Sequence, residues 1–139
     1  MKCVMDIFEM PDLLKKYMDV KWLRHEVLAN NIANVDTPNF KRSDVIFEDL
    51  LKNYLKENSS KLPLSTTNEK HIQNIWSVRD VKPKIIIQND RTLRNDGNNV
   101  DIDKEMVDLA RNALSYNILA EQVQREFSLL RSAITEGRR

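Results

Sequence analysis

The sequence predicts a mainly α-helical protein, in which long N- and C-terminal helices form a coiled-coil-like hairpin around a less regular middle. Apolar residues recur every three or four positions near both ends of the chain, which is the period of one helix face. Only two glycines and four prolines occur in 139 residues, too few for the tight turns of an all-β sandwich. A chain of this length holds one ordinary domain. We expect a helical core of residues 1–57 and 100–139, with residues 58–99 as an irregular linker segment that includes minor β structure.

The clearest pattern belongs to the C-terminal helix, which we expect to start near Asp101 or Asp103 and to stop before Gly137. Its apolar positions alternate steps of four and three without a break, as in a heptad repeat. These positions, which we call the seam, are Ile102, Met106, Leu109, Ala113, Tyr116, Ala120, Val123, Phe127, Leu130 and Ile134. So regular a seam predicts that the helix lies along other helices and serves as an assembly surface.

The first predicted helix covers residues 11–35, with Pro11 at its first position, where the missing N–H costs nothing. One apolar stripe follows its face: Leu14, Met18, Trp22, His25, Leu28 and Ile32. Pro38 and Asn39 then fit the centre of a turn in which Asn39 takes positive φ. At ~1.5 Å per residue the last helix is ~51 Å long and the first ~36 Å, so the end of the seam stays uncovered. Exposed apolar surface of this kind marks an interface.

The middle of the chain gives weaker signals. Residues 43–57 are predicted to form a short helix with Ser43 as its N-cap. Residues 58–67 are polar and are predicted to form a linker. The run Ile85-Ile86-Ile87 is a short strand candidate, and residues 95–99 form a turn candidate.

No residue pattern indicates catalysis, a metal site or a cofactor, so we expect a protein that is not an enzyme. His25 and His71 have no second ligand at helical spacing, and we expect His25 to be a packed core histidine. If Gly97 is aligned with the turn glycine of a calcium loop, Thr92 and Arg94 fall at ligand positions, and Arg94 would repel the ion. The formal net charge of +1 provides no basic field for nucleic acid.

Two acidic patterns have structural interpretations. The cluster at the start of the last helix is expected to complement the positive helix end; it consists of Asp101, Asp103, Glu105 and Asp108. Near the N-terminus, Asp6, Glu9 and Asp12 interrupt the apolar run, so no cleavable signal peptide is expected.

Residues 28–42, LANNIANVDTPNFKR, resemble the N-terminal signature of bacterial flagellar rod, hook and hook-associated proteins. The signature positions are Asn30, Asn31, Ile32, Asn34, Asp36, Thr37, Pro38, Asn39 and Phe40. That family usually has Gly and Tyr where this chain has Asn39 and Phe40. Asn can still reach the left-handed conformation, so the turn is expected to survive. Phe40 keeps the aromatic ring of the usual Tyr but lacks its hydroxyl group.

A second segment, residues 93–106, resembles the second signature of the proximal rod proteins. Its positions are Asp96, Gly97, Asn98, Val100, Asp101, Asp103 and Met106. The ending, residues 127–134, also fits, and the chain is short. Together these features are similar to the bacterial flagellar basal-body rod protein family.

The resemblance implies a structural subunit of the proximal rod, the drive shaft that transmits torque from motor to hook. It implies assembly with copies of itself, with other rod proteins and with the rod–membrane-ring adaptor protein. It also implies export by the flagellar type III apparatus without a cleavable signal, and a location in the basal body, where the rod spans the periplasm. It implies neither a nucleic acid partner nor a small-molecule substrate.

Three alternatives remain open at this point. The chain could instead be a neighbouring proximal rod protein, which shares the first signature. The short length of the chain and residues 93–106 favour the rod protein described above. A helical adaptor or chaperone-like binding module of flagellar export would fold alone and bind one partner at fixed stoichiometry. A hydrolase acting on the cell wall would need a catalytic pair, and the sequence offers no candidate.

Overall fold

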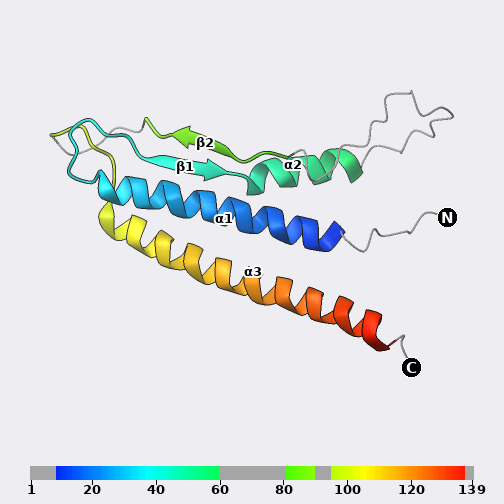
Figure 1. Cartoon of the computed structure of the whole chain (residues 1–139). Helices are drawn as coiled ribbons and strands as arrows, with labels where there is room; N and C mark the ends of the chain where they lie inside the picture. Colours follow the sequence, from blue (N-terminus) through cyan, green and yellow to red (C-terminus); the bar gives the residue numbers. More distant parts are fainter. Residues whose placement is uncertain (1–8, 60–80, 90–94, 137–139) are drawn as a thin grey trace.

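The computed structural model describes residues 9–59, 81–89 and 95–136 (Figure 1). The elements are α1 (Glu9–Ala33), β1 (Ser43–Ile46), α2 (Glu48–Ser59), β2 (Lys84–Ile87) and α3 (Ile102–Glu136). α1 and α3 run antiparallel and pack together, while β1, β2 and α2 lie on the other side of α1. The predicted fold class, with long packed terminal helices and a minor β segment, is confirmed.

Helix α1 starts two residues earlier than predicted, so Pro11 lies within the first turn rather than at the first helical position. The first turn needs no intrahelical partner for its N–H groups, so proline is tolerated there. The helix gives way to successive turns, in which the Thr37 N–H donates to the Asn34 carbonyl at 3.1 Å. Asn39 has φ of 61°, which confirms the predicted left-handed residue of the Pro38-Asn39 turn.

The prediction of a helix over residues 43–57 is wrong at its start. Residues Ser43–Ile46 form β1, which pairs antiparallel with β2 so that Val45 faces Ile85. Pairing with a segment far away in the sequence overrides the local helix signal, and the β-branched residues on both strands suit a pleated sheet. Helix α2 therefore begins at Glu48, with the Phe47 carbonyl accepting from Leu51 N–H at 2.9 Å. The strand predicted at 85–87 is confirmed as part of β2.

A small apolar core lies between α1 and the β1–α2 segment. Val45 and Phe47 stand two positions apart, so both point to the same side, towards α1. Phe47 is fully buried, and its ring meets that of Tyr17 edge-on with centroids 5.3 Å apart. The core residues are Val20, Val27, Val45, Phe47 and Leu51. The core thus fastens β1 and α2 to α1, and α3 contributes no residue to it.

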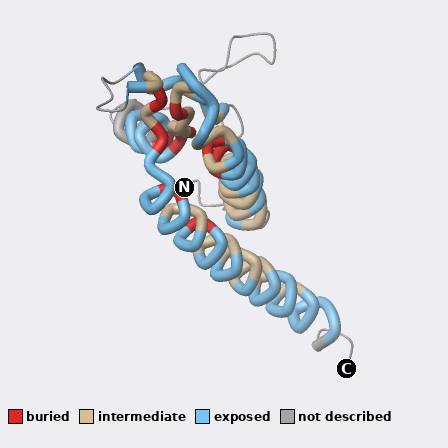
Figure 2. Tube along the Cα trace, turned by 90° about the vertical axis from the view of Figure 1, so that its left-hand side faces the viewer, coloured by how far each residue is buried: buried red, intermediate tan, exposed pale blue. Residues whose placement is uncertain are grey.

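Helix α3 is the longest element and the least covered. It has 35 residues against 25 in α1, an excess of ~15 Å. Its only buried described residues, Glu105 and Asn112, lie in its first third, and Figure 2 shows α3 sloping away from the rest of the fold with exposed and half-buried residues along its second half. No helix in the described ranges is long and apolar enough to cross a membrane.

The structure places part of the predicted linker in the fold. Within residues 58–99, β2 pairs with β1, and Val81 packs against the core. Residues 60–80 and 90–94 lie outside the described residues. The division into a helical core and a linker stays a prediction.

We expect Phe47→Ala to lower the free energy of unfolding by about 3–5 kcal/mol, since it removes a buried aromatic ring and leaves a cavity. Leu50→Ala is the matched control, because Leu50 lies in the first turn of α2, three residues from Phe47, and is partly exposed. Urea unfolding followed by circular dichroism measures both. Equal losses in the two variants would contradict the core assigned to α1, β1 and α2.

Candidate functional site: the signature junction and the exposed faces of α3

The two signatures meet at one end of the α1–α3 pair, which we call the signature junction. Asn98, fully buried, directs its side-chain amide nitrogen at the carbonyl oxygens of Asn34, Val35 and Thr37, at 2.9, 2.9 and 3.0 Å. Two of these carbonyls, those of Asn34 and Thr37, also accept a backbone N–H within the turn. A side chain of the second signature therefore caps the turn that follows α1.

The facing turns fit together closely. The Asn39 N–H donates to the Asp96 carbonyl at 2.8 Å, and Lys41 Nζ donates to the Gly97 carbonyl at 2.7 Å. Gly97 has φ of 74°, and a Cβ added there would lie 2.8 Å from Oδ1 of Asn39. Only glycine combines that φ with so close an approach at no steric cost. The second signature thus needs its glycine to pack against the first.

A buried charge joins three elements at this junction. Glu105, on the first turn of α3, is fully buried and accepts a hydrogen bond from Nε of Arg42. Its other oxygen accepts from Nδ2 of Asn31 on α1 at 2.9 Å. The Asn31 amide also pairs with Ser43 through both its atoms, donating to the carbonyl at 2.8 Å and accepting from the N–H at 3.0 Å. α1, the start of β1 and α3 are therefore locked together.

Arg42 has further partners around the same point. Its side chain donates to Gln88 at 3.1 Å and to Asp44 at 3.3 Å, and it lies 3.8 Å from Asp108. The Asn99 side chain accepts from the Arg42 N–H at 2.7 Å. Burial alone would lower the pKa of Arg42, but hydrogen bonding to Glu105 and its charge outweigh burial and raise the pKa above its ordinary value.

A second ion pair ties α1 to the start of α2. The Arg24 guanidinium donates two hydrogen bonds of 2.7 Å to the Glu48 carboxylate, and Lys21 Nζ lies 3.4 Å from the same carboxylate. Hydrogen bonding to Arg24 lowers the pKa of Glu48 from 4.5 to about 2, against the opposing effect of burial. Bidentate pairs of this kind fix geometry as well as charge.

The remaining signature residues have smaller roles. Asp101 caps α3, accepting from the Asp103 N–H at 3.1 Å, which settles the choice left open by the sequence. Val100 is buried beside it. The other signature residues with exposed side chains are Asn30, Asp36, Pro38, Asp103 and Met106, and Ile32 and Phe40 are half-buried.

Reasoning from sequence missed Glu105 as the centre of the junction. It treated the residue as one of several acids complementing the helix end, whereas the structure buries it. The signal was available in the spacing: Glu105, Asn112 and Leu119 stand in phase with the half-buried seam residues Leu109 and Tyr116. Polar residues in that phase indicate partners within the facing helix.

The seam lies at the edge of the α1–α3 contact rather than at its centre. Half of its residues are half-buried, namely Leu109, Tyr116, Ala120, Val123 and Leu130. The other half are exposed and form what we call the outer seam: Ile102, Met106, Ala113, Phe127 and Ile134. α1 therefore covers one side of the seam and leaves the other to solvent. That the seam joins subunits stays a prediction.

A second stripe of exposed apolar residues runs along another side of α3, outside the seam predicted from the sequence. Val107, Leu114, Ile118 and Leu129 are between 51% and 66% exposed. Their spacing of seven, four and eleven residues keeps them on one side of the helix, away from the outer seam. Helix α3 thus presents two separate apolar stripes to solvent.

His25 is exposed, so the prediction of a packed core histidine is wrong. It lies next to Trp22, which is 65% exposed, with ring centroids 6.2 Å apart. The core faces another side of α1, where Val20 and Val27 lie, because β1 and α2 pack there. The broad apolar stripe of α1 thus divides into a covered side and a free side.

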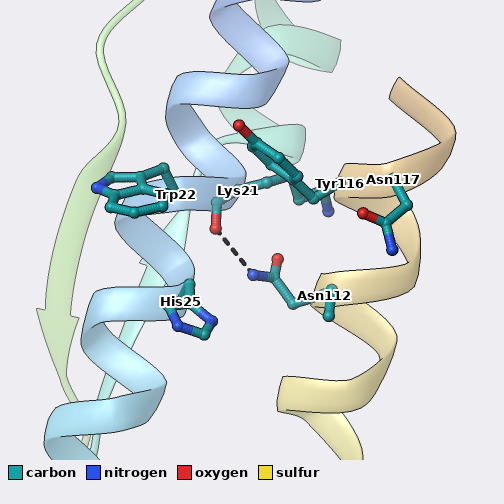
Figure 3. A pocket seen from close by; sticks show the side chains of 7 residues that line it. Lys21, Trp22, His25, Asn112, Tyr116 and Asn117 are labelled. Carbon is teal, nitrogen blue, oxygen red and sulfur yellow. Dashed lines mark hydrogen bonds between the residues drawn. The ribbon is translucent and has the colours of Figure 1, made fainter. Parts of the chain in front are cut away.

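A groove of about 170 Å³ lies between the free side of α1 and the outer seam. Figure 3 shows side chains from the two helices on opposite sides of it. This helix groove is lined by Lys21, Trp22 and His25 of α1 and by Asn112, Ala113, Tyr116 and Asn117 of α3. Its lining brings together the aromatic residues Trp22 and Tyr116.

The described residues contain no group of three or more His, Cys, Asp or Glu side chains placed to hold a metal ion. Thr92 and Arg94, considered above for a calcium loop, lie outside the described residues. The features that the structure does display are interlocked helices and uncovered apolar faces. They define a helical protein of a structural kind, with two long helices locked together and apolar faces left uncovered.

Comparison with known proteins narrows that class. The family described as "Flagella basal body rod protein" matches residues 23–41, which include most of the first signature. Flagellar basal body rod protein FlgB of Borrelia hermsii is 48% identical over 118 residues, covering 82% of this chain and 87% of the relative. Its counterpart in Borreliella burgdorferi is 41% identical, covering 78% and 82%. That of Bacillus subtilis is 37% identical, covering 84% and 85%.

The chain therefore belongs to the FlgB family of flagellar basal body rod proteins, which are structural proteins of the rod. The family resemblance inferred from the two signatures is confirmed. Nothing in the comparisons favours the neighbouring proximal rod protein or an export adaptor.

We expect Glu105→Gln to destabilise the fold strongly, because it leaves the Arg42 guanidinium buried without its main counter-charge. Breaking one side of a buried pair typically costs about 3–5 kcal/mol. The control is Asp108→Asn, which removes a partly exposed carboxylate 3.8 Å from the same arginine and should cost less than ~1 kcal/mol. Urea unfolding of both variants gives the comparison, and a loss for Glu105→Gln no larger than that of the control would refute the central role of this residue.

Glu48 makes stability depend on pH. Its pKa is about 2 in the folded chain and 4.5 as a free side chain, so its contribution is present above pH 4.5 and is lost as the pH falls towards 2. Glu48 is 46% exposed, so the contribution should stay below ~1 kcal/mol. We expect Glu48→Gln to be less stable than the unchanged chain at pH 7, with a gap that closes near pH 2. A gap that persists at pH 2 in urea titrations would contradict this assignment.

Proposed function

We propose that this chain is a subunit of the proximal part of the flagellar rod and that it transmits torque through helix-to-helix contacts made by the uncovered faces of α3. The observation that carries the proposal is the outer seam. Its four large apolar side chains are each 45% to 77% exposed, and the described part of the chain covers none of them fully. Exposed apolar surface is costly in an isolated subunit and is stabilising once another helix buries it, at ~25 cal/mol per Å².

The signature junction supports this function because a drive shaft needs subunits that keep their shape under load. Bonds between α1, β1 and α3 at the junction run through side chains that are fully buried, such as Asn31, Asn98 and Glu105. Satisfied buried polar networks favour one arrangement over nearby alternatives. The angle between α1 and α3 is therefore held at their loop end, while their faces remain available for contacts.

We further propose that the partners are copies of this chain, other rod proteins and the rod–membrane-ring adaptor protein. In this proposal the flagellar type III apparatus exports the chain without a cleavable signal, and the rod that it joins spans the periplasm. Two apolar stripes on separate sides of α3 support contacts with more than one neighbour, since a single partner helix could cover only one of them.

An export adaptor remains the alternative of another class. Such a module would bind one partner at fixed stoichiometry and would be absent from finished basal bodies. Purified basal bodies from cells expressing the tagged chain distinguish the two: a rod subunit stays in the preparation after membrane and cytoplasmic proteins are washed away. Absence of the chain from intact basal bodies would overturn the proposed function.

We expect Ala113→Leu to impair rod assembly and Ala110→Leu to leave it nearly unchanged. Both alanines are exposed on α3, and leucine is a good helix former, so neither folding nor helix propensity separates the variants. Only Ala113 lies on the outer seam, where added bulk in a close contact typically costs ~1–3 kcal/mol. Swimming assays and counts of completed basal bodies provide the measurement. Equal behaviour of the two variants would show that the outer seam is not an assembly surface.

A further inference from the structure

The two-stranded sheet has one closed edge and one open edge. β1 lies between α1 and β2 (Figure 1), and side chains of α1 reach the outer edge of β1. Asn31 bonds to both the N–H and the carbonyl of Ser43, and Arg24 donates to the Val45 carbonyl at 3.0 Å. The Val45 N–H donates to the Asp44 side chain at 2.7 Å. β1 therefore offers no free backbone to a further strand.

The open edge belongs to β2. The Gln88 N–H donates to the Arg42 carbonyl at 2.8 Å, and along an antiparallel pair such inward-bonding positions alternate with outward-facing ones. The register then directs the N–H and carbonyl of Ile86 towards β1, and those of Ile85 and Ile87 away from it. No described residue bonds to the outward groups of Ile85 and Ile87. β2 thus presents unpaired donors and acceptors at strand spacing.

The side chains of the same two residues add apolar surface to this edge. Ile85 and Ile87 are 49% and 64% exposed, although they stand on the face of the sheet that carries the buried Val45. Val45 belongs to the core against α1, and neither isoleucine does. Covering both isoleucines requires an element beside β2, in the position of a third strand.

The opposite face of β2 carries positive charge. Lys84 points to the side of the sheet turned away from Val45 and α1, and Lys82 lies two residues earlier. Both lysines are exposed, and neither forms an ion pair with any described residue. A strand added beside β2 therefore meets apolar residues on one face and unmatched cations on the other.

The acids of the neighbouring elements leave these lysines without a counter-charge. Asp44 is bonded to Arg42 at 3.3 Å, and Glu48 is bonded to Arg24. Asp49, in the first turn of α2, makes no ion pair with either lysine, and the acids of α1 lie across the sheet from them. A partner that brings negative charge to this face gains ion pairs that the isolated chain lacks.

We propose that the open edge of β2 binds an extended segment of a partner protein. The segment has apolar residues on its face next to Ile85 and Ile87 and acidic residues on its face next to Lys82 and Lys84. Extended segments bind free sheet edges by main-chain hydrogen bonds, and their alternate side chains give specificity. Pro83 has no N–H to donate, so it marks the start of the edge. This edge is separate from the faces of α3 that carry the proposed function.

A second copy of β2 fits this edge less well than an acidic segment. When two copies pair through Ile85 and Ile87, the neutral Gln88 of one copy faces Lys84 of the other, so the lysine stays unmatched. Lysine on an edge strand commonly protects against pairing between identical copies. Opposite charges across a strand pair are stabilising. Lys84 therefore favours an acidic strand over a second copy of this chain.

Peptide binding to the full-length purified chain tests the proposal. The probe is a labelled peptide of alternating Glu and Val, and the control peptide alternates Lys and Val at equal length. We expect the acidic peptide to bind more tightly at low salt, where charges are least screened. Amide exchange should then slow at Ile85 and Ile87, whose N–H groups face outwards, and change little at Ile86, which bonds to β1.

Two variants separate the backbone bonds from the charges. Ile87→Pro removes an outward N–H and no bond to β1, so we expect it to keep the circular dichroism spectrum and to lose the peptide. Ile87→Val should keep both. Lys84→Glu changes an exposed residue without an ion pair, so we expect it to weaken binding of the acidic peptide and strengthen binding of the lysine peptide, each about two- to fivefold.

Each outcome decides for or against the acidic segment. Slower exchange at Ile85 and Ile87 with the acidic peptide, together with the reversed preference of Lys84→Glu, supports it. Equal binding of the two peptides, no protection at these isoleucines, or protection confined to α3 overturns it. Protection that rises with the concentration of the chain alone identifies a second copy as the occupant and also overturns it.

The test does not depend on one variant or on the rod function. If Ile87→Pro unfolds the sheet, Lys84→Glu and the exchange pattern still decide. Failure of the peptide to bind leaves the proposed rod function standing, because the basal-body preparation tests that function separately.

Discussion

The buried carboxylate of Glu105 is the constraint on which the rest of the structure depends. A carboxylate removed from water is tolerated only when its oxygens are paired and hydrogen-bonded. Its partners, Arg42 and Asn31, come from the start of β1 and from α1. The first turn of α3 can therefore occupy only one place, and its rotation about its own axis is fixed. That rotation decides which side chains of α3 meet α1 and which face outwards.

This rotation places polar side chains of α3 against α1 and several apolar side chains in solvent. The side that meets α1 carries Glu105 and Asn112, which bond to specific atoms of α1, while several of the large apolar side chains stand one step round the helix in solvent. A helix of a self-sufficient monomer has the opposite arrangement, with apolar residues inwards and polar residues outwards. In this chain the polar contacts orient the two helices, and much of the apolar surface of α3 stays exposed.

Much of the fold was predictable from the sequence because its determinants are local. The two long helices follow from their periodicity, the start of α3 from the cap at Asp101, and the left-handed Asn39 from its turn. The start of α2 was predicted wrongly because β1 exists only through pairing with β2, about forty residues away. The signature residues were recognised, but their mutual bonding was not. No periodicity reveals that Asn98 would cap the turn after α1, or that the partners of Glu105 would be Arg42 and Asn31.

The long separations within the signature junction bear on the order in which the chain can fold. The amide of Asn98 reaches a carbonyl 64 positions earlier, and Glu105 reaches Asn31 across 74 positions. Contacts of such range close slowly, because the entropy of a large loop is lost before any bond compensates for it. The turn after α1 therefore lacks its Asn98 cap until most of the polypeptide is available to fold. The junction between the two signatures is accordingly one of the last parts of the fold to become rigid.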